Sequence, residues 1–440
     1  MINPRLSAKD WTQPKVYRGA LILGFVLAAL GILLQRFDLA LMGIPPLLVT
    51  SVAGHSRPKG RTIGHFEAPV PNTNAGLPLT TETNEKYHLA LPGVDNVDAV
   101  QVRVYSPGHR PTTLVTKPGN LGLTFDSVRT GPHPTFTVQA RGHGAFDLWQ
   151  EQPWATVASE TVGLPTNSPL GLMPAPARLR GLTGSRQSRR FGDGGDLRDI
   201  APMRPGDSLR RVDWRATGRR SPELNQLYVR RTFSNAEGIA ELVIDSRDDV
   251  GPDLETWRGS GDLRGDDLTS LDLARNAAAS VAGALIATGD RVGLEDLAYQ
   301  RRPVAAATGQ RQLRRIQQAL ALSRPKGEPS KLLRPPRLPN DAVIYLFSTL
   351  LDDTPLTLAS GWIDQGNVVI VIDTLPNVRT GRSANLAFAW RITQLERNLR
   401  LETLKAQGIP IVPWHSAGSV APATEFAKVA RAQAKTRGRR

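Results

Sequence analysis

The segment Ile239–Ile244 has the sequence Ile-Ala-Glu-Leu-Val-Ile, and Asp245 follows it directly. Short apolar runs of this kind recur downstream, at Val292–Leu297, Ala342–Phe347, Val368–Ile372 and Ile409–Val412. Stretches with helical periodicity separate them, at Leu268–Thr288, Gln310–Ser323, Pro355–Gln365, Ser383–Ala406 and Ala423–Ala434. Apolar strands that alternate with helices are typical of a parallel sheet covered on both faces. We therefore predict a doubly wound α/β domain over residues 237–440.

Asp245 stands at the end of the first predicted strand of this domain. Sheets of this class bind ligands beyond the carboxyl ends of their strands, so Asp245 marks a candidate site. The chain contains no phosphate-binding glycine loop, no dinucleotide fingerprint, no nucleophile elbow and no His-Glu-x-x-His pair. It also has no cysteine, which excludes disulfides, cysteine-bound metals and a thiol nucleophile. These absences predict a protein without enzymatic activity.

Upstream of the α/β domain, residues 62–180 show a period of two. Val100, Val102 and Val104 alternate with polar residues, and Pro-Gly pairs separate such runs. This pattern predicts short antiparallel strands, and we assign the region to a β-sandwich. Its histidines lack the spacing of metal ligands.

Two uncharged apolar runs precede the sandwich, Gly19–Leu34 and Leu39–Gly54, each of 16 residues. As helices they would be about 24 Å long, somewhat short for a bilayer, and Pro45-Pro46 should kink the second. A cleaved signal peptide or a buried soluble hairpin are the alternatives. The immediate second run argues against the first, and the absence of a polar face argues against the other. We predict a transmembrane helical hairpin within a membrane anchor at residues 1–61.

Cations flank both predicted spans. Arg5, Lys9, Lys15 and Arg18 precede the first, and Arg57, Lys59 and Arg61 follow the second. The positive-inside rule then places both ends, and with them the soluble body, in the cytoplasm, as expected for a two-span protein of the cell membrane. If only the first run spans the bilayer, the body lies outside.

The formal net charge of the chain is +15, and its arginines are clustered. Between Arg178 and Arg231 the chain has fourteen arginines, six acids and no lysine. Anionic lipid, acidic protein and nucleic acid are the possible partners of such a segment. Nucleic acid is the least favoured, because aromatic residues are few and no reading module is present.

We assign the arginine-rich segment to residues 181–236. Its most distinctive part runs from Gly194 to Arg220. Pro205, Gly206 and Asp207 predict a turn, and an alternating-charge run surrounds Trp214. Arginines and aspartates can lock together as bidentate pairs or present a cationic surface. We keep two compatible interpretations, a clamp between sandwich and α/β domain and a partner-docking surface. The candidate residues are Arg198, Pro205, Gly206, Asp207, Arg210, Arg211, Asp213, Trp214 and Arg219.

The order Leu197-Arg198, Pro205-Gly206-Asp207, Arg210-Arg211-Val212-Asp213-Trp214 and Ala216-Thr217-Gly218-Arg219 resembles the signature of the domain of unknown function 58 family. The resemblance implies a prokaryotic membrane protein whose C-terminal half is similar to a von Willebrand factor type A domain. It also implies a MoxR-type AAA+ ATPase as partner, in the assembly or remodelling of other proteins, and no established enzymatic activity.

The family resemblance implies comparison with the metal site of type A domains, which uses an Asp-x-Ser-x-Ser motif after the first strand. The chain departs from this motif. Asp245 fits the first position, but Arg247 and Asp249 replace the serines. Since Arg247 brings a cation to this place, we predict that Asp245 pairs with an arginine and that no cofactor binds. A Mg²⁺-dependent enzyme is the alternative, using Asp245 with the nearby acids Asp248, Asp249, Asp352 and Asp353.

Overall fold

The computed structural model describes residues 10–67, 79–80, 84–126, 128–133, 135–158, 161–174, 186–223, 225–258, 263–298, 302–325, 335–340, 342–381, 383–414 and 422–438. The chain forms two compact units. The first contains residues 1–128, 132–162 and 262–266, and the second contains residues 129–131, 163–261 and 267–440. The main passage between units is thus at residue 163, whereas the predicted boundary at residue 180 lies outside the described residues.

The first unit begins with a helical hairpin, α1 (Lys15–Leu33) and α2 (Phe37–His55). Each helix has 19 residues, three more than its apolar run, and is about 28 Å long. Both are long and apolar enough to cross a membrane. Pro45 and Pro46 lie inside α2.

Glycines let the two helices approach closely. A Cβ atom on Gly31 would lie 2.3 Å from the backbone nitrogen of Ala40. A Cβ atom on Gly43 would lie 2.6 Å from the carbonyl oxygen of Gly24. Because only glycine leaves room for backbone at these distances, the hairpin depends on these small residues.

The rest of the first unit is built from antiparallel strands. One sheet has the order β1 (Trp11–Thr12), β10 (Gln150–Glu151), β9 (Thr137–Gly144), β5 (Val97–Tyr105) and β6 (Thr112–Thr116), with β11 (Trp154–Val157) also paired to β9. A second sheet contains β2 (His65–Glu67), β4 (Asn84–Leu91) and β7 (Gly119–Asp126). Alternate side chains of β4, β5 and β9 share one hydrophobic cluster, with Tyr87, Val102 and Val138 at its centre. The period-two pattern of the sequence therefore corresponds to real strands.

Shorter elements complete the region of the antiparallel strands. A third small sheet contains β3 (Leu79–Thr80), β12 (Thr161–Gly163) and β8 (Gly131–His133). A 3-10 turn, η1, covers Ala145–Asp147.

The second unit contains a six-stranded sheet in the order β17-β16-β15-β18-β19-β20. Five strands are parallel: β15 (Ile239–Ile244), β16 (Arg291–Asp296), β18 (Val343–Ser348), β19 (Val368–Asp373) and β20 (Ile411–Pro413). These five were predicted within two residues at each end. The sequence did not predict the sixth strand, β17 (Val304–Ala307), which pairs with β16 antiparallel. Its four small residues after Pro303 carry no periodic signal.

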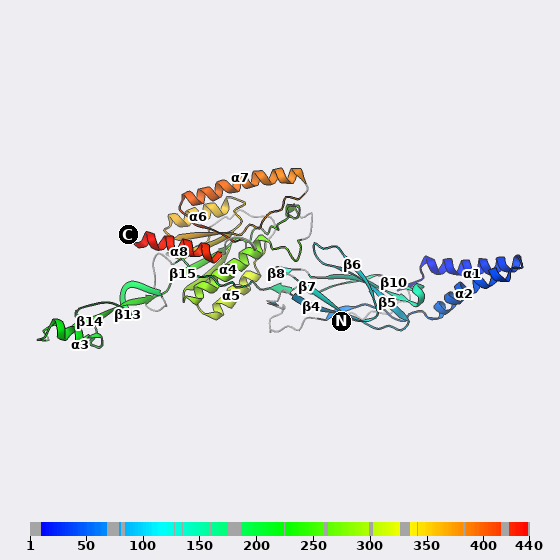
Figure 1. The fold of residues 1–440 in the computed structure, drawn as a ribbon, viewed down its shortest axis with the longest axis horizontal. Coiled ribbons are helices and arrows are strands. Elements are labelled where there is room, and N and C mark those ends of the chain that lie inside the picture. Colours follow the sequence, from blue (N-terminus) through cyan, green and yellow to red (C-terminus); the bar gives the residue numbers. More distant parts are fainter. Residues whose placement is uncertain are drawn as a thin grey trace. The chain divides into compact units, whose positions relative to one another are not determined.

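Helices cover both faces of this sheet (Figure 1). They are α4 (Ser270–Ala287), α5 (Gln310–Ala321), α6 (Thr354–Asp364), α7 (Ala384–Ala406) and α8 (Pro422–Gly438), with the short η3 turn at Leu254–Arg258. On one face Leu242 and Ile244 pack in a cluster with α4, α5 and α8. On the other, Val243 packs in a cluster with α6 and α7. Successive residues of β15 thus point to opposite layers, which explains its unbroken apolar sequence.

The arginine-rich segment forms a long antiparallel hairpin that the sequence did not predict. Strand β13 (Arg186–Pro202) pairs with β14 (Tyr228–Ala236), and η2 (Leu209–Arg211) and α3 (Trp214–Arg220) lie between them. The predicted turn at Pro205–Asp207 is present, with φ +97° at Gly206. The strands escaped prediction because β13 is polar and rich in glycine and Arg230-Arg231 interrupts β14, so neither shows a sustained apolar alternation.

Candidate functional site

Asp245 lies where β15 ends, at the carboxyl edge of the parallel strands. Its backbone nitrogen donates to the carbonyl oxygen of Phe347 at 2.9 Å, which extends the pairing of β15 with β18 by one residue. The hydroxyl of Ser348 donates to Asp245 Oδ2 at 2.9 Å. The sheet therefore fixes the Asp245 carboxylate beside the end of the neighbouring strand.

Arg247 joins Asp245 to Asp352. Its Nε and Nη2 donate to the two carboxylate oxygens of Asp245 at 2.8 and 2.9 Å. Its Nη1 and Nη2 donate to Asp352 Oδ2 and Oδ1 at 2.7 and 2.9 Å. Only 3% of the Arg247 side chain is exposed. The pairing of Asp245 with Arg247 follows the prediction, whereas Asp352, which follows β18, was not predicted as a second partner.

Burial raises the pKa of both Asp352 and Asp248, but nearby charges change the outcome at each. Burial alone would raise the pKa of Asp352, but the hydrogen bonds and positive charge of Arg247 hold that pKa below its ordinary value. Burial, helped by the negative charge of Asp245, raises the pKa of Asp248 to about 6. Arg247 therefore favours the ionised form of Asp352, while Asp248 can accept a proton at about pH 6.

These residues do not fit a divalent metal. A bound Mg²⁺ needs several oxygens converging at about 2.1 Å, and Ca²⁺ needs more at slightly longer distances. Here a guanidinium lies between the two carboxylates and takes up their oxygens. Within the described part of the chain, no cluster of three or more histidines and acids could hold a metal ion. The donor set therefore forms an ion-pair network.

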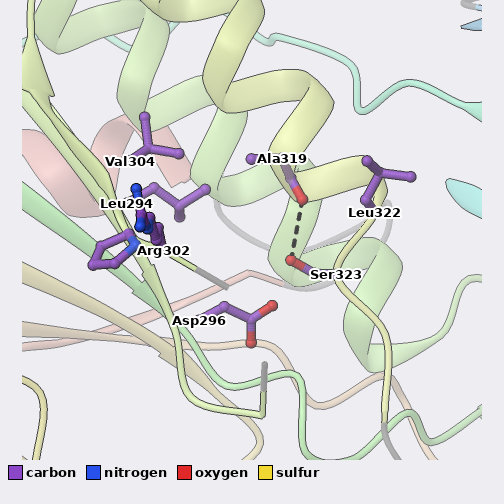
Figure 2. Close-up of a pocket in the computed structure, with 8 residues that line it drawn as sticks. Leu294, Asp296, Arg302, Val304, Ala319, Leu322 and Ser323 are labelled. Atoms are coloured by element: carbon purple, nitrogen blue, oxygen red, sulfur yellow. Dashed lines mark hydrogen bonds between the residues drawn. The ribbon is translucent and has the colours of Figure 1, made fainter. Parts of the chain in front are cut away.

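A pocket lies beside the next strand end, where Asp296 closes β16 (Figure 2). Asp296 accepts a hydrogen bond from the Ser246 hydroxyl, and burial raises its pKa. The other lining residues are Leu294, Arg302, Pro303, Val304, Ala319, Leu322 and Ser323. Ser323 donates to the carbonyl oxygen of Ala319 at 3.3 Å. Since no histidine is among these lining residues, the pocket lacks the base of a serine–histidine nucleophile.

A second buried network, which sequence reasoning missed, surrounds Asp272 in the first turn of α4. Its Oδ1 accepts from the backbone nitrogen and hydroxyl of Thr130 at 2.7 and 2.8 Å. Its Oδ2 accepts from the Thr269 hydroxyl at 2.8 Å and forms an ion pair with Arg129, and its Oδ1 forms an ion pair with Arg275. The capping pattern Thr269-x-x-Asp272 could have been recognised in the sequence. The distant partners could not, since they are more than 140 residues away.

In the arginine-rich hairpin, both aspartates of the signature pair with arginines of β14. Asp213 caps α3 by accepting from the backbone nitrogen of Ala216 at 2.9 Å, and it accepts from Arg230 Nε at 2.8 Å. Asp207 accepts from the Arg204 backbone nitrogen at 2.8 Å and from Arg231 Nη2 at 3.4 Å. These pairs form a clamp within the hairpin. A role between domains stays a prediction.

Other signature residues face solvent at the end of the hairpin. Leu209 and Trp214 are 67% and 66% exposed. Also exposed around them are Pro205, Gly206, Arg210, Arg215 and Arg219, while Arg211 is half-buried. Arg198, further along β13, lies over the ring of Phe233 at 5.8 Å. We call Leu209, Arg210, Trp214, Arg215 and Arg219 the hairpin tip. It combines exposed apolar side chains with a high density of positive charge.

A family model described as "Protein of unknown function DUF58" matches residues 199–357. The chain contains a DUF58 domain. The matched span of the DUF58 domain begins in β13 and ends in α6, so it includes the hairpin tip, Asp245, Arg247 and Asp352. The family predicted from the signature is confirmed. No curated protein and no solved structure matches the chain.

Proposed function

We propose that this protein is a membrane-anchored, non-catalytic scaffold that binds other proteins through its DUF58 domain. The observation that carries the proposal is the surface of the α1–α2 hairpin. Its buried positions are small, namely Gly24 and Gly31 in α1 and Gly43, Thr50 and Ala53 in α2. Its large apolar side chains point outward instead.

These outward side chains cover the length of both helices. They are Val16, Ile22, Leu23, Phe25, Val26, Leu30, Ile32, Leu33, Leu34, Phe37, Leu41, Met42, Ile44, Leu48 and Val52. Water-soluble proteins seldom expose so large a contiguous apolar surface. In a bilayer the same surface faces lipid, and close glycine contacts are the usual means of helix association. The arrangement thus supports a hairpin that spans the membrane.

We infer that the soluble body faces the cytoplasm. Lys15 and Arg18 lie in the first turn of α1, and Arg57, Lys59 and Arg61 follow α2. The turn between the helices carries Arg36, whose charge is offset by Asp38 at 3.4 Å. The excess of cations at the open end of the hairpin supports this sidedness by the positive-inside rule.

For the α/β unit we propose a von Willebrand factor type A-like domain that has lost its metal. The five parallel strands, helices on both faces, and Asp245 at the first strand end support this likeness. Arg247 supplies the positive charge between the acids that a metal would otherwise supply. The family resemblance adds a MoxR-type AAA+ ATPase as the proposed partner, in the assembly or remodelling of other proteins.

We propose the hairpin tip as the surface that contacts this partner. Tryptophan and arginine dominate the binding energy of many protein interfaces, and the exposed Trp214 has three exposed arginines within five positions of it in the chain. A negatively charged protein surface with an apolar pocket would match this chemistry.

The anchor is tested by fractionating cells that produce either the full chain or a variant without residues 1–61. We expect the full chain to stay in membranes after an alkaline carbonate wash and the truncated chain to be released. In sealed right-side-out vesicles the cytoplasmic face is inside. If protease cleaves the body only after these vesicles are opened, the cytoplasmic location is supported. A full chain that is released by carbonate would contradict the anchor.

The partner is tested by affinity capture from detergent extracts with nucleotide present. We expect wild-type protein to recover an AAA+ ATPase and the double variant Leu209→Ala/Trp214→Ala to lose at least about 90% of it, as loss of a hot spot does. Leu172→Ala removes an equally exposed apolar side chain elsewhere in the same unit and serves as control. Recovery of nucleic acid that disappears with salt, and of no ATPase, would overturn the proposal in favour of nucleic-acid binding.

A further inference from the structure

Helix α7 carries an apolar stripe that the unit it belongs to does not cover. Phe388, Ile392, Leu395 and Leu399 are 66%, 46%, 65% and 69% exposed. Among the described residues after Trp214, these are the large hydrophobic side chains that are exposed. In Figure 1, α7 is the long helix at the outer side of the α/β unit, next to α6.

The opposite side of α7 holds the helix to its own unit. Trp390 packs with Leu254 and Leu375, and Leu404 is fully buried in the cluster that includes α6. Arg397 forms an ion pair with Asp373 and donates to the carbonyl oxygen of Thr349 at 2.8 Å. The stripe is therefore a second face of a firmly seated helix.

The spacing of the stripe is that of a two-stranded coiled coil. The steps from Phe388 to Leu399 are four, three and four residues, which is the alternation of d and a positions. Ile392 then occupies an a position and Leu395 a d position, the combination that favours two strands in parallel coiled coils. Asn385 falls at the preceding a position, where a single asparagine fixes register and favours two strands.

The charges beside the stripe on one copy of α7 are complementary to those on a second copy. In this register Arg391 is at a g position and Glu396 is at the e position of the next heptad. In a parallel pair, each g residue meets the following e residue of the other helix, so two Arg391–Glu396 pairs would form. In an antiparallel pair the g residues Arg391 and Asn398 meet instead, and no opposite charges come together.

We propose that α7 is a homodimer interface, in which two copies of this chain pair their α7 helices in parallel and in register through Phe388, Ile392, Leu395 and Leu399. The interface is separate from the hairpin tip and does not involve the proposed ATPase. Attachment of both copies to one membrane would raise their effective concentration, so a short seam of this size suffices.

The absence of cysteine from the chain allows a direct test by cross-linking in proteoliposomes that contain only the full-length protein. We expect Phe388→Cys and Leu399→Cys each to give a disulfide-linked dimer with itself on mild oxidation. Gln394→Cys, also exposed on α7 but off the stripe, is the control and should stay monomeric. In an antiparallel pair, the two copies of residue 388 would be about 16 Å apart, too far for a disulfide.

Exchanging the charges of Arg391 and Glu396 tests dimerisation independently. A local folding defect would not be reversed by the second substitution. We expect Arg391→Glu or Glu396→Arg alone to weaken dimerisation about tenfold in analytical ultracentrifugation of the detergent-solubilised chain, and the double variant to restore it. Circular dichroism confirms that each variant is folded. Single-cysteine variants that give no cross-linked dimer together with a wild type that sediments as a monomer, a cross-link only between Phe388→Cys and Leu399→Cys chains, or cross-links in native membranes only to other proteins would each overturn the proposal.

Discussion

Arg247 and Asp352 are 105 positions apart in the chain, yet they form a bidentate ion pair with donor–acceptor distances of 2.7 and 2.9 Å. The pair joins the loop after β15 to the loop after β18. Because the same guanidinium also holds Asp245, one buried arginine neutralises two acids at the carboxyl edge of the sheet. This edge is where α/β proteins commonly bind ligands. Here the buried guanidinium of Arg247 takes up oxygens of both carboxylates.

Replacing Arg247 with alanine should destabilise the second unit. The side chain of Asp245 is 6% exposed and would be left with an uncompensated charge, while Asp352 is 41% exposed and would be partly hydrated. We expect a loss of about 2 to 3 kcal/mol at neutral pH, less than for a fully buried pair. Urea unfolding measures it, with Arg314→Ala on α5 as the exposed control. Equal stability of the two variants would contradict a structural role.

Chelation tests whether the stability of the chain depends on a metal at the network of Asp245, Arg247 and Asp352. We expect EDTA or millimolar Mg²⁺ to leave the thermal unfolding midpoint of the wild type unchanged, because a ligand that binds only the folded state would raise it. Calorimetric titration with Mg²⁺ gives a second readout. A saturable heat that disappears in Asp245→Ala would show that the alternative, a metal-dependent protein, is right.

Glu241 makes the stability of the α/β unit depend on pH. This residue of β15 is 7% exposed, and its carboxyl occupies space that a Cβ on Gly293 would fill at 2.2 Å. Burial, together with the negative charge of Glu295, raises its pKa from 4.5 to about 7. The folded state thus binds this proton more tightly than the unfolded state, so stability is fully present below pH 4.5 and is lost as the pH rises through about 7.

Glu241→Gln should therefore remove this pH dependence. We expect the variant to exceed the wild type at about pH 8 by up to ~3 kcal/mol, and the difference to vanish below about pH 4.5. Unfolding curves at a series of pH values give the slope. Glu402→Gln, at an exposed position of α7, should follow the wild type. A variant that is less stable than the wild type at every pH would sink this explanation.

Asp272→Asn should be among the most damaging single changes in the chain. Asp272 is fully buried, and its removal as an anion takes an ion-pair partner from both Arg275 and Arg129, of which Arg129 keeps its pair with Asp249. Breaking a buried ion pair in this way costs about 3 to 5 kcal/mol. Although burial opposes it, the charges of both arginines lower the pKa of Asp272, so the contribution is present at neutral pH and is lost in acid.

Chemical unfolding of Asp272→Asn at neutral pH measures the loss. Asp364→Asn, an exposed position on α6, is the matched control. A loss below about 1 kcal/mol, the size expected for exposed pairs, would mean that the network contributes little to stability.

The glycine contacts of the anchor can be tested with two alanine substitutions in one helix. Gly31→Ala should separate α1 from α2, because the new Cβ would lie 2.3 Å from the backbone of Ala40. Gly19→Ala should be neutral or slightly stabilising, since nothing lies within 4 Å of its Cβ position. Thermal unfolding in detergent and the yield in the membrane fraction are the readouts. If both variants behave alike, the close hairpin is wrong.

Much of the α/β unit was predictable because its signals are long and periodic. Each of its five helices was predicted to begin within two residues of where it does, and α8 extends further than expected, to Gly438. Periodicity reports burial, so elements without a continuous apolar face gave no signal. The β13–β14 hairpin, the α3 helix between its strands and the short strand β17 are such cases.

The sequence by itself determined which segments are apolar and which alternate between apolar and polar residues. It also determined which family the arginine-rich signature belongs to, and that a cation lies two residues after Asp245. These properties are local, and the chemistry of neighbouring residues decides them. Only the tertiary structure decided that Asp352 completes the arginine network, that Thr130 and Arg129 meet Asp272, and that Gly31 touches Ala40. Such partners depend on how strands and helices pack. Close packing selects contacts by their shape and register in space, and the separation of two residues along the chain does not specify either.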